Sequence, residues 1–201
     1  MIDNSFRRFL PAYLDGILRF LRKLKITPNQ LTFFAFLVAL ASAYFVFIGY
    51  YYSAIVTWWF SRFFDACDGI YARKYSLTSN FGAYLDIQLD MAAYSLMVIA
   101  FSLRFPEFYL AWMLMLFFYV LCVTGALSLG NFETQLNIKD SSGRGLRLAS
   151  GLAEGGETGL AYTLFLLFPH WLNITTKIWL AVLLVTVIAR LYLAFKILRI
   201  K

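Results

Sequence analysis

The chain has 201 residues, of which 61% are hydrophobic and 14% charged, and its net charge is +7 at neutral pH. These proportions exclude an ordinary soluble domain, whose surface needs more charged residues. Because the apolar residues lie in long runs, the positive charge favours anionic membrane lipid over nucleic acid as the partner, and the sequence predicts an all-α integral membrane protein.

The N-terminal part has the pattern of a helix that lies on a membrane surface. Apolar residues recur at helical spacing over 5–25, and arginines fall mostly on the other side. This pattern predicts an amphipathic interfacial helix within a first region, residues 1–26. The alternative is the packed first helix of a soluble bundle, which the apolar segments that follow make less favourable.

Six transmembrane helices are predicted in the second region, residues 27–201. Thr27 and Pro28 begin the first, as an N-cap residue and a proline in the first turn. No charged residue occurs from Leu31 to Ser61, which is longer than one span of a roughly 30 Å bilayer core requires. We therefore expect two spans that meet near 49–52. The second span ends near Lys74, and the others cover about 79–103, 108–131, 151–168 and 174–197.

An even number of spans places both chain ends on one side of the membrane. Most Lys and Arg residues lie in the N-terminal segment, the 73–74 turn, the loop over 132–150 and the C-terminal tail, whereas the opposite loops contain only Arg104 and Lys177. By the positive-inside rule the basic side is cytoplasmic. We therefore expect an inner or plasma membrane protein with both termini in the cytoplasm.

Four acidic residues interrupt the apolar pattern at Asp65, Asp68, Asp86 and Asp90. Acids inside a membrane are costly and mark functional sites. Each pair shares one face of a helix, and the short turn over 73–80 would bring the two pairs together. Because crowded carboxylates repel one another unless divalent cations lie among them, the spacing predicts a Mg²⁺ or Mn²⁺ site that opens toward the cytoplasm.

The same stretch contains the pattern D-x2-D-G-x2-A-R-x8-G-x3-D-x3-D without a gap. It resembles the signature of the CDP-alcohol phosphotransferases, also called CDP-alcohol phosphatidyltransferases, which are membrane enzymes of phospholipid synthesis. The resemblance implies transfer of a phosphatidyl group from CDP-diacylglycerol, or a related CDP-lipid such as an ether lipid, to an alcohol, with release of CMP. It also implies two divalent ions and a homodimer.

The resemblance assigns roles to the residues of the pattern. Asp65, Asp68 and Asp86 would be the principal metal ligands. Asp90 would be the general base that takes a proton from the acceptor hydroxyl, and it is also counted as a metal ligand. The candidates for contact with the CDP-lipid are Asn29, Gly69, Ala72, Arg73 and Gly82. Close helix packing is the alternative role for the glycines and the alanine, and anchoring at the interface is the alternative for the arginine.

The candidate acceptor-binding residues lie in the C-terminal half, at Arg144, Arg147, Glu154, Glu157 and Arg190. The arginines would form an anion pocket, although an ion pair of Arg190 with Glu154 or Glu157 is the alternative. In the inositol-phosphate branch of the family the fifth span opens with Glu-Arg-Pro-Glu-Arg, whereas this chain reads AEGGET and lacks both arginines. Glycerol 3-phosphate is therefore the leading acceptor, while inositol phosphate, serine and a lipid alcohol, as in cardiolipin synthesis, stay open.

Three other classes of membrane protein also fit part of the pattern. An intramembrane aspartyl protease needs one catalytic pair of acids rather than four acids with glycine and arginine at this spacing. A cation transporter lines its path with acids near the bilayer midplane, whereas these acids lie toward one face. A structural scaffold has no use for clustered acids. A transferase is therefore the prediction, with a cation transporter as the alternative of another class.

Overall fold

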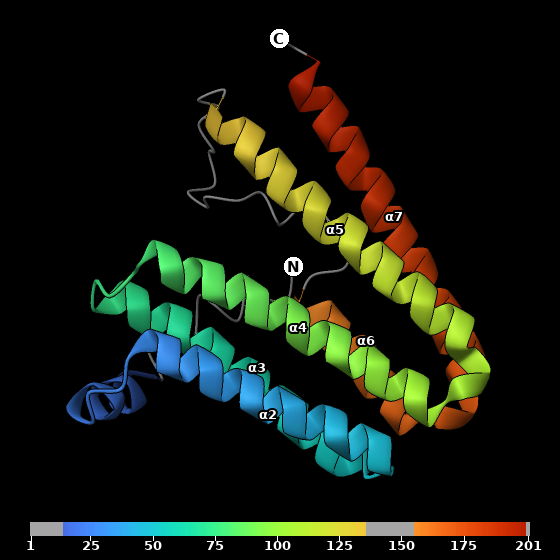
Figure 1. Ribbon diagram of the computed structural model, residues 1–201, viewed down its shortest axis with the longest axis horizontal. Helices are drawn as coiled ribbons and strands as arrows, with labels where there is room; N and C mark the ends of the chain where they lie inside the picture. Colours follow the sequence, from blue (N-terminus) through green and yellow to red (C-terminus); the bar gives the residue numbers. More distant parts are fainter. Residues whose placement is uncertain (1–13, 136–154, 200–201) are drawn as a thin grey trace. The chain divides into compact units, whose positions relative to one another are not determined.

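The computed structural model describes residues 14–135 and 155–199, and every regular element in these ranges is helical. A first helix covers residues 14–23. The other helices, in chain order, are α2 Pro28–Ile48, α3 Tyr51–Lys74, α4 Asn80–Arg104, η1 Pro106–Phe108, α5 Tyr109–Gln135, α6 Gly155–Leu167, η3 Pro169–Trp171 and α7 Leu172–Leu198 (Figure 1). The all-α fold class is therefore confirmed for the described part of the chain.

The helix boundaries follow local signals in the sequence. Thr27 caps α2 through a capping box, in which its hydroxyl accepts from the N–H of Gln30 and its own N–H donates to the Gln30 side chain. Gly49 ends α2 in the left-handed conformation, with φ of 86°, which glycine adopts without strain. Ser79 caps α4 by accepting from the N–H of Gly82. The predicted starts at Pro28 and near Ser79 are confirmed.

Four stretches of the described residues are long and apolar enough to cross a membrane: Pro28–Ile48, Asn80–Arg104, Pro106–Phe132 and Pro169–Leu198. This indicates an integral membrane protein. Two of the six predicted spans, those at α3 and α6, are not among the four. Helix α3 is long enough, but charged residues near its C-terminal end lower its hydropathy, and the described part of α6 has only 13 residues. The count of six spans stays a prediction.

The described chain divides into two compact units, one that ends at Glu107 and one that begins at Phe108. In the first unit α2 packs against both α3 and α4 (Figure 1). The buried face of α2 carries small side chains, including Ala35, Ala39 and Ala43, which allow close approach of helix backbones. Ser42 on the same helix is fully buried and donates to the carbonyl of Ala54 on α3 at 2.8 Å. These contacts fix α3 beside α2.

The helix over residues 14–23 packs against the C-terminal part of α3. Leu14 and Leu18 are buried in a cluster with Leu31, Cys67, Ile70 and Tyr71. Asp15 pairs with Lys74, and the hydrogen bond from this lysine holds the pKa of Asp15 below its ordinary value. The helix thus has one face against the protein, whereas Ile17 and Phe20 on another face are exposed.

The second unit is built from α5, α6 and α7, and α5 lies beside α7. Its interior contains a polar cluster in which the hydroxyl of Tyr119 accepts from Tyr162 at 3.1 Å and from the Trp179 indole at 3.2 Å. Trp112 and Phe165 make an edge-to-face contact between α5 and α6. The three helices are therefore joined by aromatic side chains whose polar atoms pair with one another.

Leu18→Ala tests how firmly the 14–23 helix is held. Because Leu18 is fully buried, its truncation should cost about 2–5 kcal/mol, whereas Ile17→Ala, at a position 44% exposed, should change stability by about 0.5 kcal/mol or less. Hydrogen–deuterium exchange in detergent should show exchange over residues 14–23 that is more than tenfold faster in the Leu18 variant only. Equal exchange in the two variants would contradict the packing described above.

Candidate active site

Helices α3 and α4 bring three carboxylates together. Asp65, Asp68 and Asp86 each offer one oxygen, and these oxygens lie within 4.8 Å of one another. Asp65 and Asp68 are one turn apart on α3, and Asp86 is one turn and a half into α4. The predicted meeting of acids from two helices is therefore seen for these three residues, which we call the carboxylate cluster.

The carboxylate cluster fits a divalent cation. At 4.8 Å and an effective dielectric constant of 20, each pair of ionised carboxylates repels by about 3.5 kcal/mol, so a cluster without cations is unfavourable. Asp68 is only 5% exposed, and its Oδ2 atom has no hydrogen-bond partner among the described residues. A buried oxygen of this kind needs a hydrogen-bond donor or a cation, and hard cations prefer carboxylate oxygen. The prediction of a Mg²⁺ or Mn²⁺ site agrees with this arrangement.

Asp90 is hydrogen-bonded to an arginine. Its Oδ1 accepts a hydrogen bond from Nη1 of Arg62 on α3, and the same nitrogen lies 3.8 Å from Asp65 Oδ2. The structure thus places the predicted general base next to the carboxylate cluster, in an ion pair with an arginine.

Arg62 is absent from the sequence-based site. Two signals in the sequence point to it: it is a charged residue inside an apolar segment, and it lies three positions before Asp65, on the same helix face. Its pairing with Asp90, 28 positions away on another helix, required the packed structure.

The predicted CDP-lipid residues lie at the start of α2, in the last two turns of α3 and at the start of α4. A Cβ atom at Gly82 would lie 2.9 Å from the Asn29 side-chain oxygen and 3.0 Å from the Ser79 hydroxyl. A Cβ atom at Gly69 would lie 3.2 Å from Nη1 of Arg73. At each glycine, the space that a Cβ atom would need is taken by a polar side chain. Ala72, the remaining candidate, lies on α3 and is half-buried.

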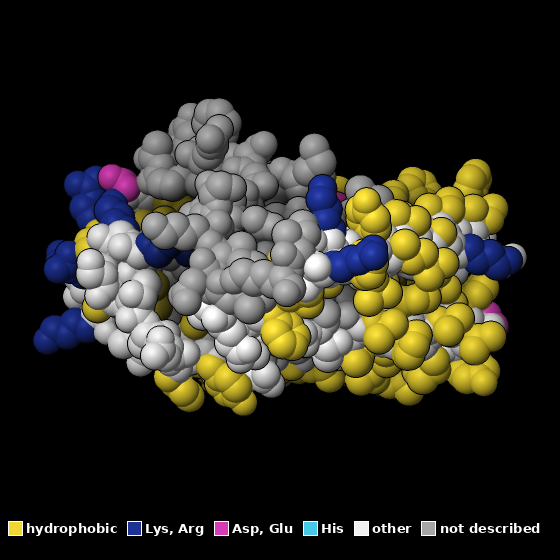
Figure 2. Space-filling view, turned by 90° about the horizontal axis from the view of Figure 1, so that it is seen from above, with side chains coloured by type: hydrophobic (Ala, Val, Ile, Leu, Met, Phe, Trp, Pro, Cys, Tyr) yellow, Lys and Arg dark blue, Asp and Glu magenta, His cyan; other side chains and the backbone are white. Residues whose placement is uncertain are grey.

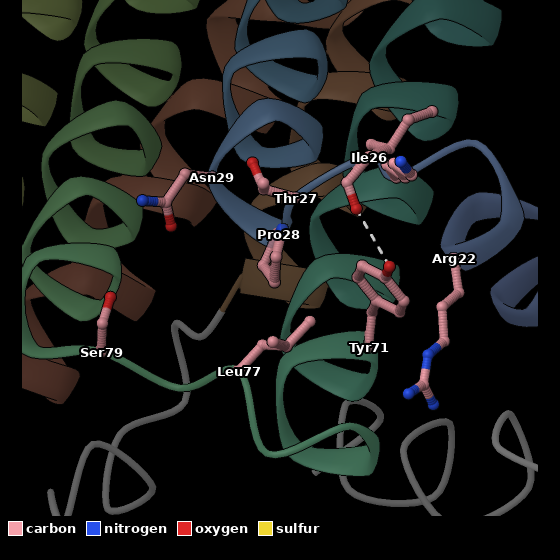
Figure 3. A pocket seen from close by; sticks show the side chains of 9 residues that line it. Arg22, Ile26, Thr27, Pro28, Asn29, Tyr71, Leu77 and Ser79 are labelled. Carbon is pink, nitrogen blue, oxygen red and sulfur yellow. Dashed lines mark hydrogen bonds between the residues drawn. The ribbon is translucent and has the colours of Figure 1, made fainter.

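A cavity of about 360 Å³ lies where α2 begins, close to the ends of α3 and α4 (Figure 3). Its walls combine cationic, polar and apolar side chains: Arg22, Lys25, Ile26, Thr27, Pro28, Asn29, Tyr71, Leu77 and Ser79. Tyr71 donates from its hydroxyl to the carbonyl of Ile26 at 2.9 Å, which fixes one wall. Asn29 belongs to this cavity and also faces Gly82, so the cavity adjoins the start of α4.

The predicted acceptor residues lie apart from this site in the chain. Arg144, Arg147 and Glu154 are outside the described residues. Glu157 is half-buried in α6, and Arg190 is half-buried in α7, where its Nη1 donates to the carbonyl of Cys122 on α5. The role of these residues in acceptor binding stays a prediction.

The sequence matches a family model for CDP-alcohol phosphatidyltransferase over residues 25–195. It is 33% identical over 175 residues to the inner membrane protein YnjF of Escherichia coli, covering 85% of this chain and 84% of that protein. It is also 38% identical over 77 residues to archaetidylinositol phosphate synthase of Pyrococcus horikoshii, covering 38% and 41% of the two chains.

The fold resembles crystal structures of phosphatidylinositol phosphate synthase from Mycobacterium tuberculosis. The complex with manganese and citrate aligns with a TM-score of 0.72 at 18% identity, over 90% of this chain and 88% of that one. The structure with CDP-DAG bound aligns with a TM-score of 0.69 at 20% identity, over 90% and 92%. At such identities the similarity establishes the fold.

Asp68→Asn tests the carboxylate cluster directly. Removing a residue that only hydrogen-bonds to a metal ligand typically weakens metal binding about 10- to 100-fold. Asp68 is a predicted ligand itself, so its loss should weaken Mn²⁺ binding at least as much. Isothermal titration of the purified protein with Mn²⁺ measures the affinity. Asp15→Asn, at an exposed acid paired with Lys74, is the matched control and should bind Mn²⁺ like the wild type. Equal affinities in the two variants would exclude Asp68 as a ligand.

Proposed function

Because the chain belongs to the CDP-alcohol phosphatidyltransferase family, we propose that it transfers a phosphatidyl group from CDP-diacylglycerol or a related CDP-lipid to an alcohol and releases CMP. Membership of the family confirms the predicted enzyme class. The observation that carries the proposal is the carboxylate cluster of Asp65, Asp68 and Asp86 beside the ion-paired Asp90.

In the proposed reaction, the acceptor hydroxyl oxygen forms a bond to the lipid phosphate, and the bond between that phosphate and CMP breaks. Asp65, Asp68 and Asp86 would hold divalent cations, proposed to be two Mg²⁺ or Mn²⁺ ions, and bound cations would supply positive charge to the diphosphate and to the departing CMP. Asp90 accepts the proton of the hydroxyl. The lipid chains stay in the bilayer.

The cavity at the start of α2 is the proposed nucleotide site. Arg22 and Lys25 provide positive charge for phosphate oxygens, and Asn29 provides hydrogen bonds to a base or ribose. Gly82 leaves room for the Asn29 side chain, since a Cβ atom on residue 82 would lie 2.9 Å from the side-chain oxygen of Asn29. The crystal structure of mycobacterial phosphatidylinositol phosphate synthase, which has a similar fold, has CDP-DAG bound, and this supports a CDP-lipid as the proposed donor.

The proposed acceptor is a phosphorylated polyol. Glycerol 3-phosphate leads because the segment AEGGET lacks the arginines that the inositol-phosphate branch carries. Inositol phosphate is the second candidate, because relatives in both the sequence and structure comparisons are named as inositol phosphate enzymes. Arg144, Arg147 and Arg190, with Glu154 and Glu157, are the proposed acceptor-binding residues.

The proposed membrane arrangement has six spans and a 14–23 helix at the interface, with both termini and the active site in the cytoplasm. Helix α3 has 24 residues and extends roughly 36 Å, which is enough to cross a bilayer core. The 14–23 helix and the residues after it include Arg19, Arg22, Lys23 and Lys25. Figure 2 shows several Lys and Arg side chains close together at the left of the view, and others elsewhere on the same face. A homodimer is also proposed, from the family resemblance.

The transferase activity is tested by release of CMP. Purified protein supplied with CDP-diacylglycerol and Mg²⁺ or Mn²⁺ should release CMP when the correct alcohol is present. Since general base catalysis contributes about 10²- to 10⁴-fold, Asp90→Asn should lower kcat at least 100-fold while CDP-lipid binding stays within threefold. Glu107→Gln, at an exposed acid outside the site, is the control and should keep full activity.

A panel of glycerol 3-phosphate, inositol phosphate, serine and phosphatidylglycerol identifies the acceptor. We expect the highest kcat/KM with glycerol 3-phosphate. A preference for inositol phosphate would overturn the choice of acceptor but leave the transferase reaction in place. If no alcohol gives CMP and reconstituted vesicles take up Mn²⁺, the protein is a cation transporter and the proposed reaction is wrong.

A further inference from the structure

Arg104, the last residue of α4, lies far from the carboxylate cluster. Asp86 is about 27 Å away along the axis of the same helix. Nε of Arg104 donates to the hydroxyl of Tyr51, the first residue of α3, at 3.1 Å. The arginine side chain therefore joins the end of α4 to the start of α3, beside the turn where α2 ends.

The turn between α2 and α3 leaves room for the guanidinium of Arg104. A Cβ atom at Gly49 would lie 3.1 Å from Nη2 and 3.4 Å from the guanidinium carbon. Gly49 also has φ of 86°, so any other residue is disfavoured at this position for two reasons. The guanidinium carbon lies 5.9 Å from the centre of the Tyr51 ring and 6.0 Å from that of Phe105. The group is therefore held across the turn and does not extend freely from α4.

The hydrogen-bonding capacity of Arg104 is mostly unused within the described part of the chain. Over residues 14–135 and 155–199, Nε makes its only hydrogen bond, and no acid forms an ion pair with it, including Glu107 three positions later. An arginine that capped α2 would donate to one of the last carbonyls of that helix, which this arginine does not do. The edge formed by Nη1 and Nη2 is therefore available, and such an edge binds two oxygens of one phosphate.

The surroundings of Arg104 are those of a membrane–water boundary. Arg104 ends one of the stretches that are long and apolar enough to cross a membrane, and Gly49 directly follows another. Tyr50 and Tyr52, on either side of Tyr51 in the chain, are 63% and 80% exposed. Tyrosine is enriched at the level of the lipid headgroups, where phospholipids carry their phosphate. The charge and the position of the guanidinium are thus both complementary to a lipid phosphate.

We propose that Arg104 binds the phosphate of a membrane phospholipid at the turn between α2 and α3, in the leaflet opposite the carboxylate cluster. Tyr51 orients the guanidinium through Nε, and Nη1 and Nη2 donate to the phosphate oxygens. A lipid bound there contacts the ends of α2, α3 and α4 together. The site is separate from the proposed donor and acceptor sites, and it does not depend on the proposed reaction.

Arg104→Gln tests the proposed lipid site, with Lys177→Gln as the matched control. Native mass spectrometry of the detergent-purified protein, titrated with phosphatidylglycerol, measures the Kd of the tightest-bound lipid. Because hydrogen bonds to charged groups are lost, Arg104→Gln should raise this Kd about 10-fold or more. Lys177 is an exposed cation on α7, so its replacement should leave the Kd unchanged. Equal Kd values for Arg104→Gln and the wild type would overturn the proposal.

Tyr51→Phe separates an oriented site from a cation that attracts lipid by charge alone, and it decides the matter if the glutamine variant does not fold. The phenylalanine keeps the ring and removes only the hydroxyl that holds Nε. The Kd for phosphatidylglycerol should rise about three- to tenfold, as expected for the loss of one orienting hydrogen bond. A wild-type Kd in this variant would overturn the oriented site.

Two competitors identify the source of the phosphate. Diacylglycerol, which has the same chains without a phosphate, should not displace phosphatidylglycerol from the tightest site of the wild-type protein. Inorganic phosphate in excess should not displace it either, and displacement by either competitor would overturn a phospholipid as the occupant. Absence of CMP release by the wild-type protein with every acceptor would overturn the proposed function but leave this inference in place.

Discussion

Charge compensation between α3 and α4 is the constraint on which the site depends. Four carboxylates lie on two adjacent helices of an apolar chain, and the structure supplies one buried guanidinium among them. The remaining negative charge favours bound cations, so metal binding and the packing of α3 and α4 against α2 are linked. The site is therefore a property of α3 and α4 as both pack against α2, and neither helix contains it alone.

The fold and the centre of the site were largely predictable from the sequence because they depend on local spacing. Thr27, Gly49 and Ser79 mark helix ends through hydrogen bonds or backbone angles that a few neighbouring residues decide. The acids recur at intervals of three and four, which fixes their helix faces without knowledge of the packing. The family match covers residues 25–195, a range that includes this pattern.

Features that depend on contacts between distant residues were not predictable in this way. The pairing of Arg62 with Asp90 joins two helices whose rotation about their axes the sequence does not specify. The number of membrane spans was also hard to predict, because the charged residues that form the site on α3 lower the mean hydropathy of that helix. The proposed acceptor-binding residues, such as Arg144, follow no fixed spacing pattern in this chain.

The alanine-lined face of α2 has a consequence for how the chain can vary. Ala35, Ala39 and Ala43 are buried where α2 packs on its two neighbours, and the nearby serine is bonded to the backbone of α3. A longer side chain on this face would push α2 away from α3 and α4 and so change the distance between those two helices. The spacing of the carboxylate oxygens on α3 and α4 would thus depend on methyl groups of α2, and substitution of these alanines would alter the affinity for cations.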